Sequence, residues 1–327
     1  MKRIEPVVPV NEVASLLEGM GRTGFQGRKL GESLDVWTQM IEDESCTIML
    51  GLSGAMIPAG MQECIKELVK KRYVDVIVST GANMFHDACE HLGIHHYRGY
   101  HHVDDAELYS KGIDRIYDVF AYEEEFRSVD TAISEFADAL APYNSSSRDL
   151  TFRLGKWLSE KNPSESSVLS ECAANDVPVF IPALCDSSIG IGLLMARRRG
   201  IDVSVDQIAD TDEITGIVES SKRTGVIYVG GGVPKNFIQQ TQVIASIHDG
   251  GNDGHHYAIQ YTTDAPHWGG LSGCTFEEAI SWGKEKPGCR NVQCFCDATI
   301  SVPVVVSGLI GRNPVRSNIP DVLGFMK

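Results

Sequence analysis

The sequence predicts an α/β protein built on a doubly wound, mostly parallel sheet. Short β-branched runs alternate with longer segments of helical period, as a parallel sheet with crossover helices requires. Several runs end in small or polar residues, which is typical of the edge where such sheets bind ligands. A chain of 327 residues with 43% hydrophobic residues is also long enough to bury a large core.

Runs rich in β-branched residues give the expected strands, and amphipathic segments give the expected helices. The expected strands are Thr47–Leu50, Val74–Ser79, Val177–Ile181, Gly225–Val229, Tyr257–Thr262 and Val292–Phe295. The expected helices are Gly60–Lys70, Ser166–Ala174, Ile189–Arg198 and Phe276–Lys284. Residues 1–45 contain no good strand, so we expect a helical extension there, followed by one catalytic domain over residues 46–327.

Composition limits the partners that the chain can have. A formal charge of −15 repels phosphate backbones, and the one dense basic run, Arg197 to Arg199, suits the end of a helix. No apolar run approaches the length of a membrane span, and the nine cysteines contain no CxxC pair. We therefore expect a cytoplasmic, reduced protein that binds neither nucleic acid nor membrane. The acidity favours small cationic ligands such as polyamines.

Three expected strands lead into turns that let backbone N–H groups approach an anion. The turns are Thr80 to Asn83, Cys185 to Ser188, and Gly230 to Gly232. The three glycines do not form a G-x-G-x-x-G pattern, so alone they fit an ordinary tight turn equally well. Asp297, which follows a further strand, could bind ribose hydroxyls and so favours a dinucleotide site.

Lys284 is the candidate nucleophile. Its segment opens with a capping-box pattern, Thr275 with Glu278, and continues as a helix that places Lys284 at its end. A lysine adds to carbonyl or imine carbon when an apolar wall desolvates its amine, and Trp282 could supply that wall. From these residues alone, an exposed lysine near a helix end remains the alternative, and Glu278 fits a plain capping residue.

Six of the ten histidines lie between residues 86 and 102. Imidazole is a common zinc ligand, but the spacing matches no HExxH or similar pattern, so we expect no metal. His86 lies closest to the Thr80 turn and is the histidine expected to face the ligand crevice.

Around Ser281 to Lys284 the sequence resembles the deoxyhypusine synthase family, and the likeness extends over most of the chain. The segments that carry it are Thr23-Gly24-Phe25-Gln26, Cys46–Gly51, Val74–Thr80, Arg153–Lys156, Val177–Asp186, Gly230–Lys235, Glu278–Lys284 and Asp297-Ala298. The many matches in the same order make this resemblance far stronger than any single motif.

The resemblance implies a Rossmann-like single domain, a homotetramer with active sites at subunit interfaces, and tightly held NAD. In the family, NAD takes a hydride from spermidine, and an aminobutyl imine passes to the lysine that matches Lys284. The fragment then moves to an acceptor amine, which is a translation-factor lysine or, in homospermidine synthases, putrescine. The matched cofactor positions are Thr80, Gly81, Asp186, Ser188, Gly231, Gly232, Thr263, Asp297 and Ala298. The matched substrate positions are His86, Asn236, Ser272, Glu278 and Trp282.

Some of the family's substrate positions are replaced. Carboxylates that hold the polyamine's ammonium groups fall on His86, Ile191 and Leu271, and the family histidine falls on Asn236. A buried ammonium would lose several kcal/mol of compensation there, which indicates an altered amine. The alternatives are homospermidine synthesis, an agmatine-type substrate, an NAD-binding paralogue without activity that assembles with a true synthase, or an ordinary nicotinamide dehydrogenase.

Overall fold

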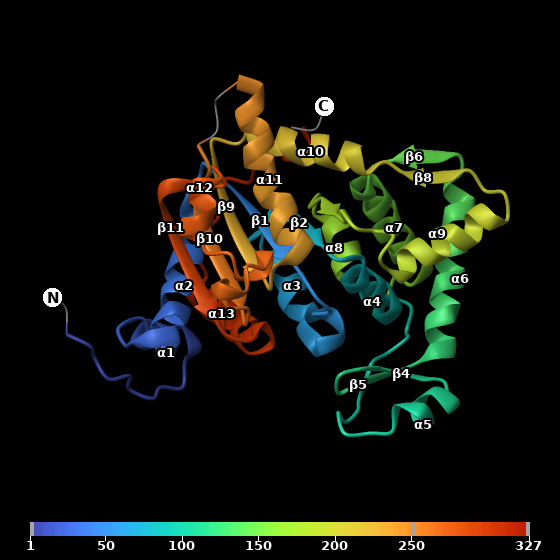
Figure 1. Ribbon diagram of the computed structural model, residues 1–327, viewed down its shortest axis with the longest axis horizontal. Helices are drawn as coiled ribbons and strands as arrows, with labels where there is room; N and C mark the ends of the chain where they lie inside the picture. Colours follow the sequence, from blue (N-terminus) through green and yellow to red (C-terminus); the bar gives the residue numbers. More distant parts are fainter. Residues whose placement is uncertain (1–2, 250–252, 325–327) are drawn as a thin grey trace. The chain divides into compact units, whose positions relative to one another are not determined.

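The computed structural model describes residues 3–249 and 253–324. The chain folds as two compact units, each of which is discontinuous in sequence. The first comprises residues 1–53, 67–78 and 211–327, and the second comprises residues 54–66 and 79–210. Helices α3 (Gln62–Lys70) and α10 (Gln207–Ser220) contain two of the points where the chain passes between units. Figure 1 shows the course of the chain.

The first unit is built on a parallel sheet with strand order β11-β10-β9-β1-β2. The pairs β1 with β9, β9 with β10, and β10 with β11 are all parallel. Its strands are β1 (Cys46–Leu52), β2 (Val76–Ser79), β9 (Arg223–Val229), β10 (His255–Thr262) and β11 (Glu285–Phe295). Because β1 is buried along its whole length, it reads as a continuous apolar run, as central parallel strands do.

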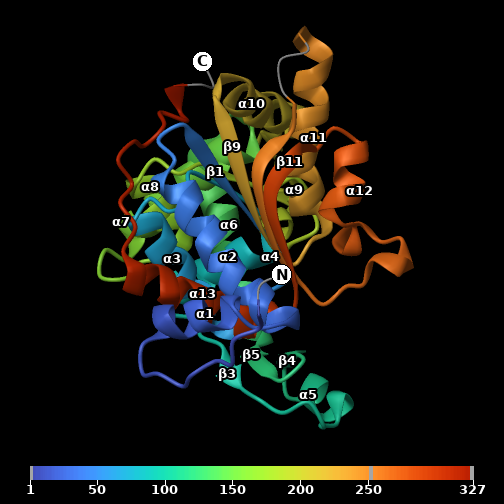
Figure 2. The ribbon, with the colours of Figure 1, turned by 90° about the vertical axis from the view of Figure 1, so that its left-hand side faces the viewer.

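Helices cover both faces of this sheet. The helices are α1 (Val13–Gly21), α2 (Phe25–Glu42), α11 (Gly232–Asp249), α12 (Phe276–Ser281) and α13 (Ala298–Arg312), with short 3-10 turns η2 (Pro266–Trp268) and η3 (Leu271–Gly273). Figure 2 shows α1, α2 and α13 on one side of the strands and α11 and α12 on the other. Two glycines mark the close approach of a helix to each face. A side chain at Gly225 would meet Met40 of α2, and one at Gly51 would meet Ile238 of α11.

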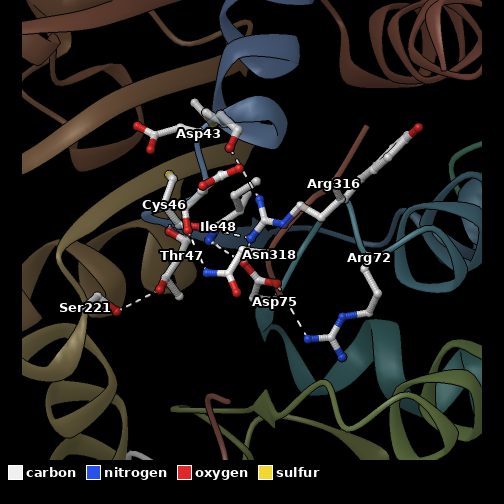
Figure 3. A network of polar contacts seen from close by, with 12 residues as sticks. Asp43, Cys46, Thr47, Ile48, Arg72, Asp75, Ser221, Arg316 and Asn318 are labelled. Carbon is white, nitrogen blue, oxygen red and sulfur yellow. Dashed lines mark hydrogen bonds and ion pairs between the residues drawn. The ribbon is translucent and has the colours of Figure 1, made fainter. Parts of the chain in front are cut away.

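A buried ion pair fixes the chain after α13 to this sheet (Figure 3). Arg316 Nη2 lies 2.6 Å from Asp75 Oδ2 and donates to the Cys46 carbonyl oxygen at 2.9 Å. The same Asp75 oxygen accepts the Ile48 N–H at 2.8 Å. Burial raises the pKa of Asp75, while the guanidinium of Arg316 opposes that shift. A buried carboxylate needs such a partner, since leaving it alone costs about 3–5 kcal/mol.

The second unit is mostly helical. Its helices are η1 (Ile57–Met61, a π-helical turn), α4 (Gly81–His91), α5 (Asp105–Ser110), α6 (Glu123–Leu140), α7 (Ser147–Lys161), α8 (Val168–Ala174) and α9 (Ser188–Arg198). Its strands are β3 (Tyr97–Arg98), β4 (Ile113–Ile116), β5 (Val119–Tyr122), β6 (Tyr143–Ser145), β7 (Val179–Phe180) and β8 (Val203–Val205). The order β3-β5-β4 is a small antiparallel sheet, and β6 pairs in parallel with β8.

The structure confirms the α/β class with a parallel sheet, and every expected strand overlaps an observed one. One expected boundary was wrong. The helix that starts at Phe276 ends at Ser281 rather than at Lys284, because Gly283 adopts a left-handed backbone with φ of 68°. Within the described chain, no helix is long and apolar enough to span a membrane.

Candidate active site

Lys284 lies between α12 and β11, in the first unit. Its backbone closes the turn after α12, since its N–H donates to the Ala279 carbonyl at 3.1 Å. Its own carbonyl accepts the His255 N–H at 3.1 Å, which ties the residue to the start of β10. The helix, the glycine turn and the strand therefore fix the backbone of Lys284 on both sides.

The side chain of Lys284 is buried, with 9% of the residue exposed. Its Nζ donates to Asn236 Oδ1 at 3.0 Å and lies 5.6 Å from the ring centre of Trp282. The expected indole neighbour is thus present, although 65% of Trp282 is exposed. The Nζ lies between an amide oxygen and an aromatic face. Among the described residues, no carboxylate forms a hydrogen bond or ion pair with it.

One face of α11 makes the contacts that hold this region together. Residues 232, 235, 236 and 239 are spaced as a single helical face. Each contacts β10, β11 or the segment between them, and two of these contacts belong to Lys235. Its Nζ donates to the Cys274 carbonyl at 2.7 Å and to Gln260 Oε1 at 2.9 Å. Gln239 Nε2 lies 3.3 Å from Glu285 Oε1.

Two buried ionisable groups lie behind Lys284. Lys235 and Glu285 are both fully buried. Burial lowers the pKa of Lys235 to about 8 and raises the pKa of Glu285 to about 8. Each group also favours the charged form of the other, so this buried pair near Lys284 can change its charge near neutral pH.

The expected glycine turn follows β9. Gly230 and Gly232 have φ values of 79° and 58°, a left-handed conformation that glycine adopts without strain. Ser272 packs on the turn, because its Oγ accepts the Gly232 N–H at 3.0 Å. The Ser53 hydroxyl donates to the Gly231 carbonyl. The structure thus brings Gly231, Gly232 and Ser272 together.

The other expected positions of the first unit lie where strands end. Thr263 is an exposed residue directly after β10. Asp297 caps α13, where its Oδ1 accepts the Thr299 N–H at 2.8 Å, and Ala298 is the first helical residue. The carboxyl ends of parallel strands meet at one edge, so these positions share the edge of the glycine turn. Glu278 is an exposed residue of α12 whose N–H donates to Thr275 Oγ1 at 3.2 Å, the half of the expected capping box that the structure contains.

Two helix starts of the second unit meet at the remaining cofactor positions. Thr80 caps α4, with its Oγ1 accepting the Asn83 N–H at 3.2 Å and donating to the Gly54 carbonyl at 2.9 Å. A side chain at Gly81 would collide with Ser187, the cap of α9. Asp186 is exposed beside it, and Ser188 opens α9. The structure therefore brings Thr80 and Gly81 to the residues around Asp186.

His86 is a buried residue of α4, with 8% of its surface exposed. Its Nδ1 lies 2.9 Å from His96 Nε2, and the rings of Phe85 and Phe126 pack against it. Burial lowers the pKa of His86 to about 4, and repulsion from His96 adds to the shift. Among the described residues, no group of three or more histidine, cysteine or acidic side chains could hold a metal ion.

Several polar residues in these contacts were not expected from the sequence. Lys235 binds Gln260, Glu285 follows Lys284 in the chain and binds Gln239, and His96 links Glu90 to His86. The helical spacing of polar residues along α11 was the signal for Lys235. Nothing comparable marks Glu285, which looks like an exposed residue at the start of a strand but is fully buried.

A model of one family, deoxyhypusine synthase, matches residues 15–309, a span that includes parts of both units. The "Probable deoxyhypusine synthase 2" of Methanosarcina acetivorans is 54% identical over 93% of this chain and 89% of its own length. The Archaeoglobus fulgidus protein of the same name is 52% identical over 89% of this chain and 96% of its own. A "Deoxyhypusine synthase-like protein" of Chlorobaculum tepidum is 37% identical over 90% and 85% of the two chains.

A solved structure gives the same result for the fold. A crystal structure of an Entamoeba histolytica protein assigned as a deoxyhypusine synthase covers 90% of this chain and 91% of its own, with a TM-score of 0.61 at 19% identity. At this identity the likeness concerns the fold alone. The family model and the close relatives go further, and together they show that this chain belongs to the deoxyhypusine synthase family, whose members are transferases of alkyl groups other than methyl.

Proposed function

We propose that this chain is an NAD-dependent aminoalkyl transferase in which Lys284 forms an imine with a polyamine fragment and passes it to an acceptor amine. The observation that carries the proposal is the buried amine of Lys284, held between the Asn236 amide and the Trp282 ring. A lysine amine in such a place is desolvated and oriented, which are the two requirements for nucleophilic addition to carbon.

Each unit, taken by itself, carries residues that fit part of NAD. In the first unit, Gly231 has no room for a side chain beside Ser272, and Gly232 has a left-handed backbone that favours glycine, so the turn presents backbone atoms. Asp297 uses Oδ1 for the helix cap, and Oδ2 can accept a ribose hydroxyl. In the second unit, the N-termini of α4 and α9 would supply N–H groups to phosphates, from Thr80, Gly81 and Ser188. Thr263 and Ala298 are the remaining cofactor positions of the first unit, and Asp186 is the remaining one of the second.

When bound, NAD would accept a hydride from the donor amine and return it to the product, so the reaction needs no outside oxidant. The chain's own residues do the rest. Lys284 Nζ adds through its lone pair to the imine carbon of the oxidised donor and displaces the other amine fragment, which leaves with the proton that Nζ loses. Asn236 holds one N–H of Lys284 and so directs the lone pair. The acceptor amine then displaces Lys284, which leaves with the proton that the acceptor loses.

The amine is expected to differ from spermidine in how its ammonium groups are held. Ile191, at the position of a family carboxylate, lines an apolar cavity of about 400 Å³ together with Leu194 and Arg197. Leu271 and His86 replace the other two carboxylates. A cavity with an arginine and no carboxylate disfavours a charged ammonium end. A diamine acceptor, as in homospermidine synthesis, or an agmatine-type donor therefore fits as well as a translation-factor lysine.

Assembly and location are part of the same proposal. The family resemblance favours a homotetramer, in which Ser272, Glu278 and Trp282 would contact a polyamine. All nine cysteines lie among the described residues and are free thiols, which agrees with a reducing, cytoplasmic setting.

Borohydride trapping tests the nucleophile. The protein is incubated with NAD and, in turn, spermidine, putrescine and agmatine, then reduced and digested for mass spectrometry. We expect an amine-derived mass increment on the peptide that contains Lys284, and none after Lys284→Ala. Lys286→Ala is the matched control, since Lys286 lies two residues away but is paired with Asp253 at 2.5 Å.

The same assay decides the second candidate, an NAD-binding paralogue without activity. The loss of the family's carboxylates at His86, Ile191 and Leu271 favours this second candidate. It would bind NAD but give neither NADH absorbance nor an adduct with any amine, and it would instead associate with an active synthase. An increment that persists in Lys284→Ala would contradict the proposed role of Lys284.

A further inference from the structure

Three side chains of the second unit form a continuous hydrogen-bonded chain from Glu90 to His86. His86 and Glu90 lie one turn apart on α4, so they share a face of the helix. The chain reverses after α4 and places His96 across both. His96 Nδ1 lies 2.6 Å from Glu90 Oε1, and His96 Nε2 lies 2.9 Å from His86 Nδ1. His95 Nδ1 binds the second oxygen of Glu90 at 2.8 Å.

The charge of Glu90 sets the direction of the protons in this chain. Burial alone would raise the pKa of Glu90, but hydrogen bonds from His96 and His95 lower it to about 2. Glu90 is therefore an acceptor only, and His96 Nδ1 must donate. With His96 neutral, its Nε2 accepts, so His86 Nδ1 carries the proton and His86 Nε2 is left with a lone pair.

The far nitrogen of His86 is open to a ligand. Nε2 has no hydrogen-bond partner among the residues that the structure describes, and it is not one of the polar atoms sealed from solvent. The ring is enclosed by Phe85 and by Phe126 of α6. Glu90 and His96 are the charged groups that act on it, while Asp130 of α6 is engaged with Ser188.

We propose that Glu90, His96 and His86 form a proton relay through which His86 Nε2 takes a proton from an ammonium group of the amine substrate. An N–H bond forms at His86 Nε2 as the one at His86 Nδ1 breaks, and the second proton moves to His96 Nε2. The positive charge is then on His96, beside the Glu90 carboxylate. It is not on His86, which lies between the rings of Phe85 and Phe126. His86 is then the base, while His96 and Glu90 are positioning residues.

This relay deepens the proposed function and rests on it. An acceptor or donor amine enters as an ammonium ion at neutral pH, and only its neutral form can add to an imine or lose a hydride. The resemblance matches His86 to a carboxylate that holds an ammonium group. A carboxylate would keep that group charged, whereas a neutral imidazole with a relay behind it removes the proton. The substrate class is therefore an amine that is deprotonated at this end.

The kinetic test compares the pH dependence of kcat in the wild type and four variants. His86→Gln should lower kcat about 100-fold with NAD affinity unchanged. Glu90→Gln removes the charge that stabilises protonated His96, so kcat should fall and the acid limb of the profile should move to lower pH. His95→Gln, which touches the same carboxylate outside the relay, and the exposed His102→Gln should keep the wild-type midpoint. If the acid limb of the kcat profile of Glu90→Gln has the same midpoint as that of the wild type, the relay is overturned.

Nitrogen NMR of histidine-labelled protein tests the relay without turnover. We expect His86 to carry its proton on Nδ1 and none on Nε2 at pH 7, and the Nε2 signal to shift when putrescine is added. A proton on Nε2 would refute the relay even if Lys284 forms its adduct. Lys284 could form no adduct with any amine, while His86 still carries its proton on Nδ1 and its Nε2 signal still shifts with putrescine. In that case the transferase proposal fails, but His86 still binds an amine.

Discussion

Gly231 shows how one residue controls the proposed cofactor turn. An added Cβ would lie 2.5 Å from Ser272 Cα and 2.7 Å from its Oγ. The backbone of Gly231 is not left-handed, so the collision alone decides the outcome. Gly231→Ala should push Ser272 away, break its bond to Gly232, destabilise the fold by about 1–3 kcal/mol and weaken NAD binding at least tenfold. Thermal unfolding and titration calorimetry measure both effects.

Gly270→Ala is the matched control for this prediction. Gly270 lies in the same connection, has a φ of −76°, and a Cβ there would meet nothing within 4 Å. It should leave the melting temperature and the NAD affinity unchanged. Equal NAD affinity in Gly231→Ala and Gly270→Ala would show that the turn does not bind the cofactor.

At the scale of elements, the strands were predictable and the details between them were not. The β-branched runs are buried on both faces, so they stand out as apolar segments, as Cys46–Leu52 does. The two-residue strand β3 (Tyr97–Arg98) of the second unit carries no periodicity and was missed. The end of α12 could have been placed at Gly283, but the helical pattern up to Lys284 concealed it.

The candidate site was predictable in the same uneven way. Lys284 and the glycine turn were singled out by the family resemblance, because their local patterns alone left alternatives open. The partners of these residues, such as Lys235 and Gln260, come from other elements, and their pairing depends on how α11 packs against the connection from β10 to β11. Single-chain periodicity indicates which face of a helix is buried, but not which side chain it meets.

The start of α13 combines a structural role and a proposed functional role in one carboxylate. Asp297→Asn keeps an oxygen that can accept the Thr299 N–H, so the helix cap survives, but it removes the anionic partner of a ribose hydroxyl. We expect Asp297→Asn to keep the melting temperature and lose NAD affinity. Asp297→Ala should lose both, with about 1 kcal/mol less stability. Equal NAD affinity in wild type and Asp297→Asn would limit Asp297 to the capping role.

For the molecule as a whole, buried ionisable groups set how stability depends on pH. His255 in the first unit and His86 in the second are held neutral, because burial lowers their pKa values to about 3 and about 4. Unfolded histidine takes up a proton near pH 6.5, so both groups favour unfolding as the pH falls below that value. Glu285 acts in the opposite direction, because its raised pKa lets the folded chain hold a proton between pH 8 and 4.5.

A substitution at His255 can isolate its contribution, because its side chain contacts uncharged partners. It is fully buried, and its Nδ1 accepts from Gln242 Nε2 at 3.0 Å beside the Thr224 hydroxyl at 2.8 Å. In His255→Asn the amide oxygen can still accept from Gln242, but the side chain does not titrate. The free energy of unfolding in urea should therefore fall from pH 7.5 to pH 5.0 by about 2 kcal/mol less in His255→Asn than in wild type.

The comparison uses the change with pH within each protein, so a constant loss of stability in the variant cancels, as does the contribution of Glu285. His101→Asn, an exposed histidine, should reproduce the wild-type change. If His255→Asn also reproduces it, His255 must already be protonated in the folded chain at pH 5.0, and a buried imidazolium without a carboxylate partner would have to be accommodated between Thr224 and Gln242.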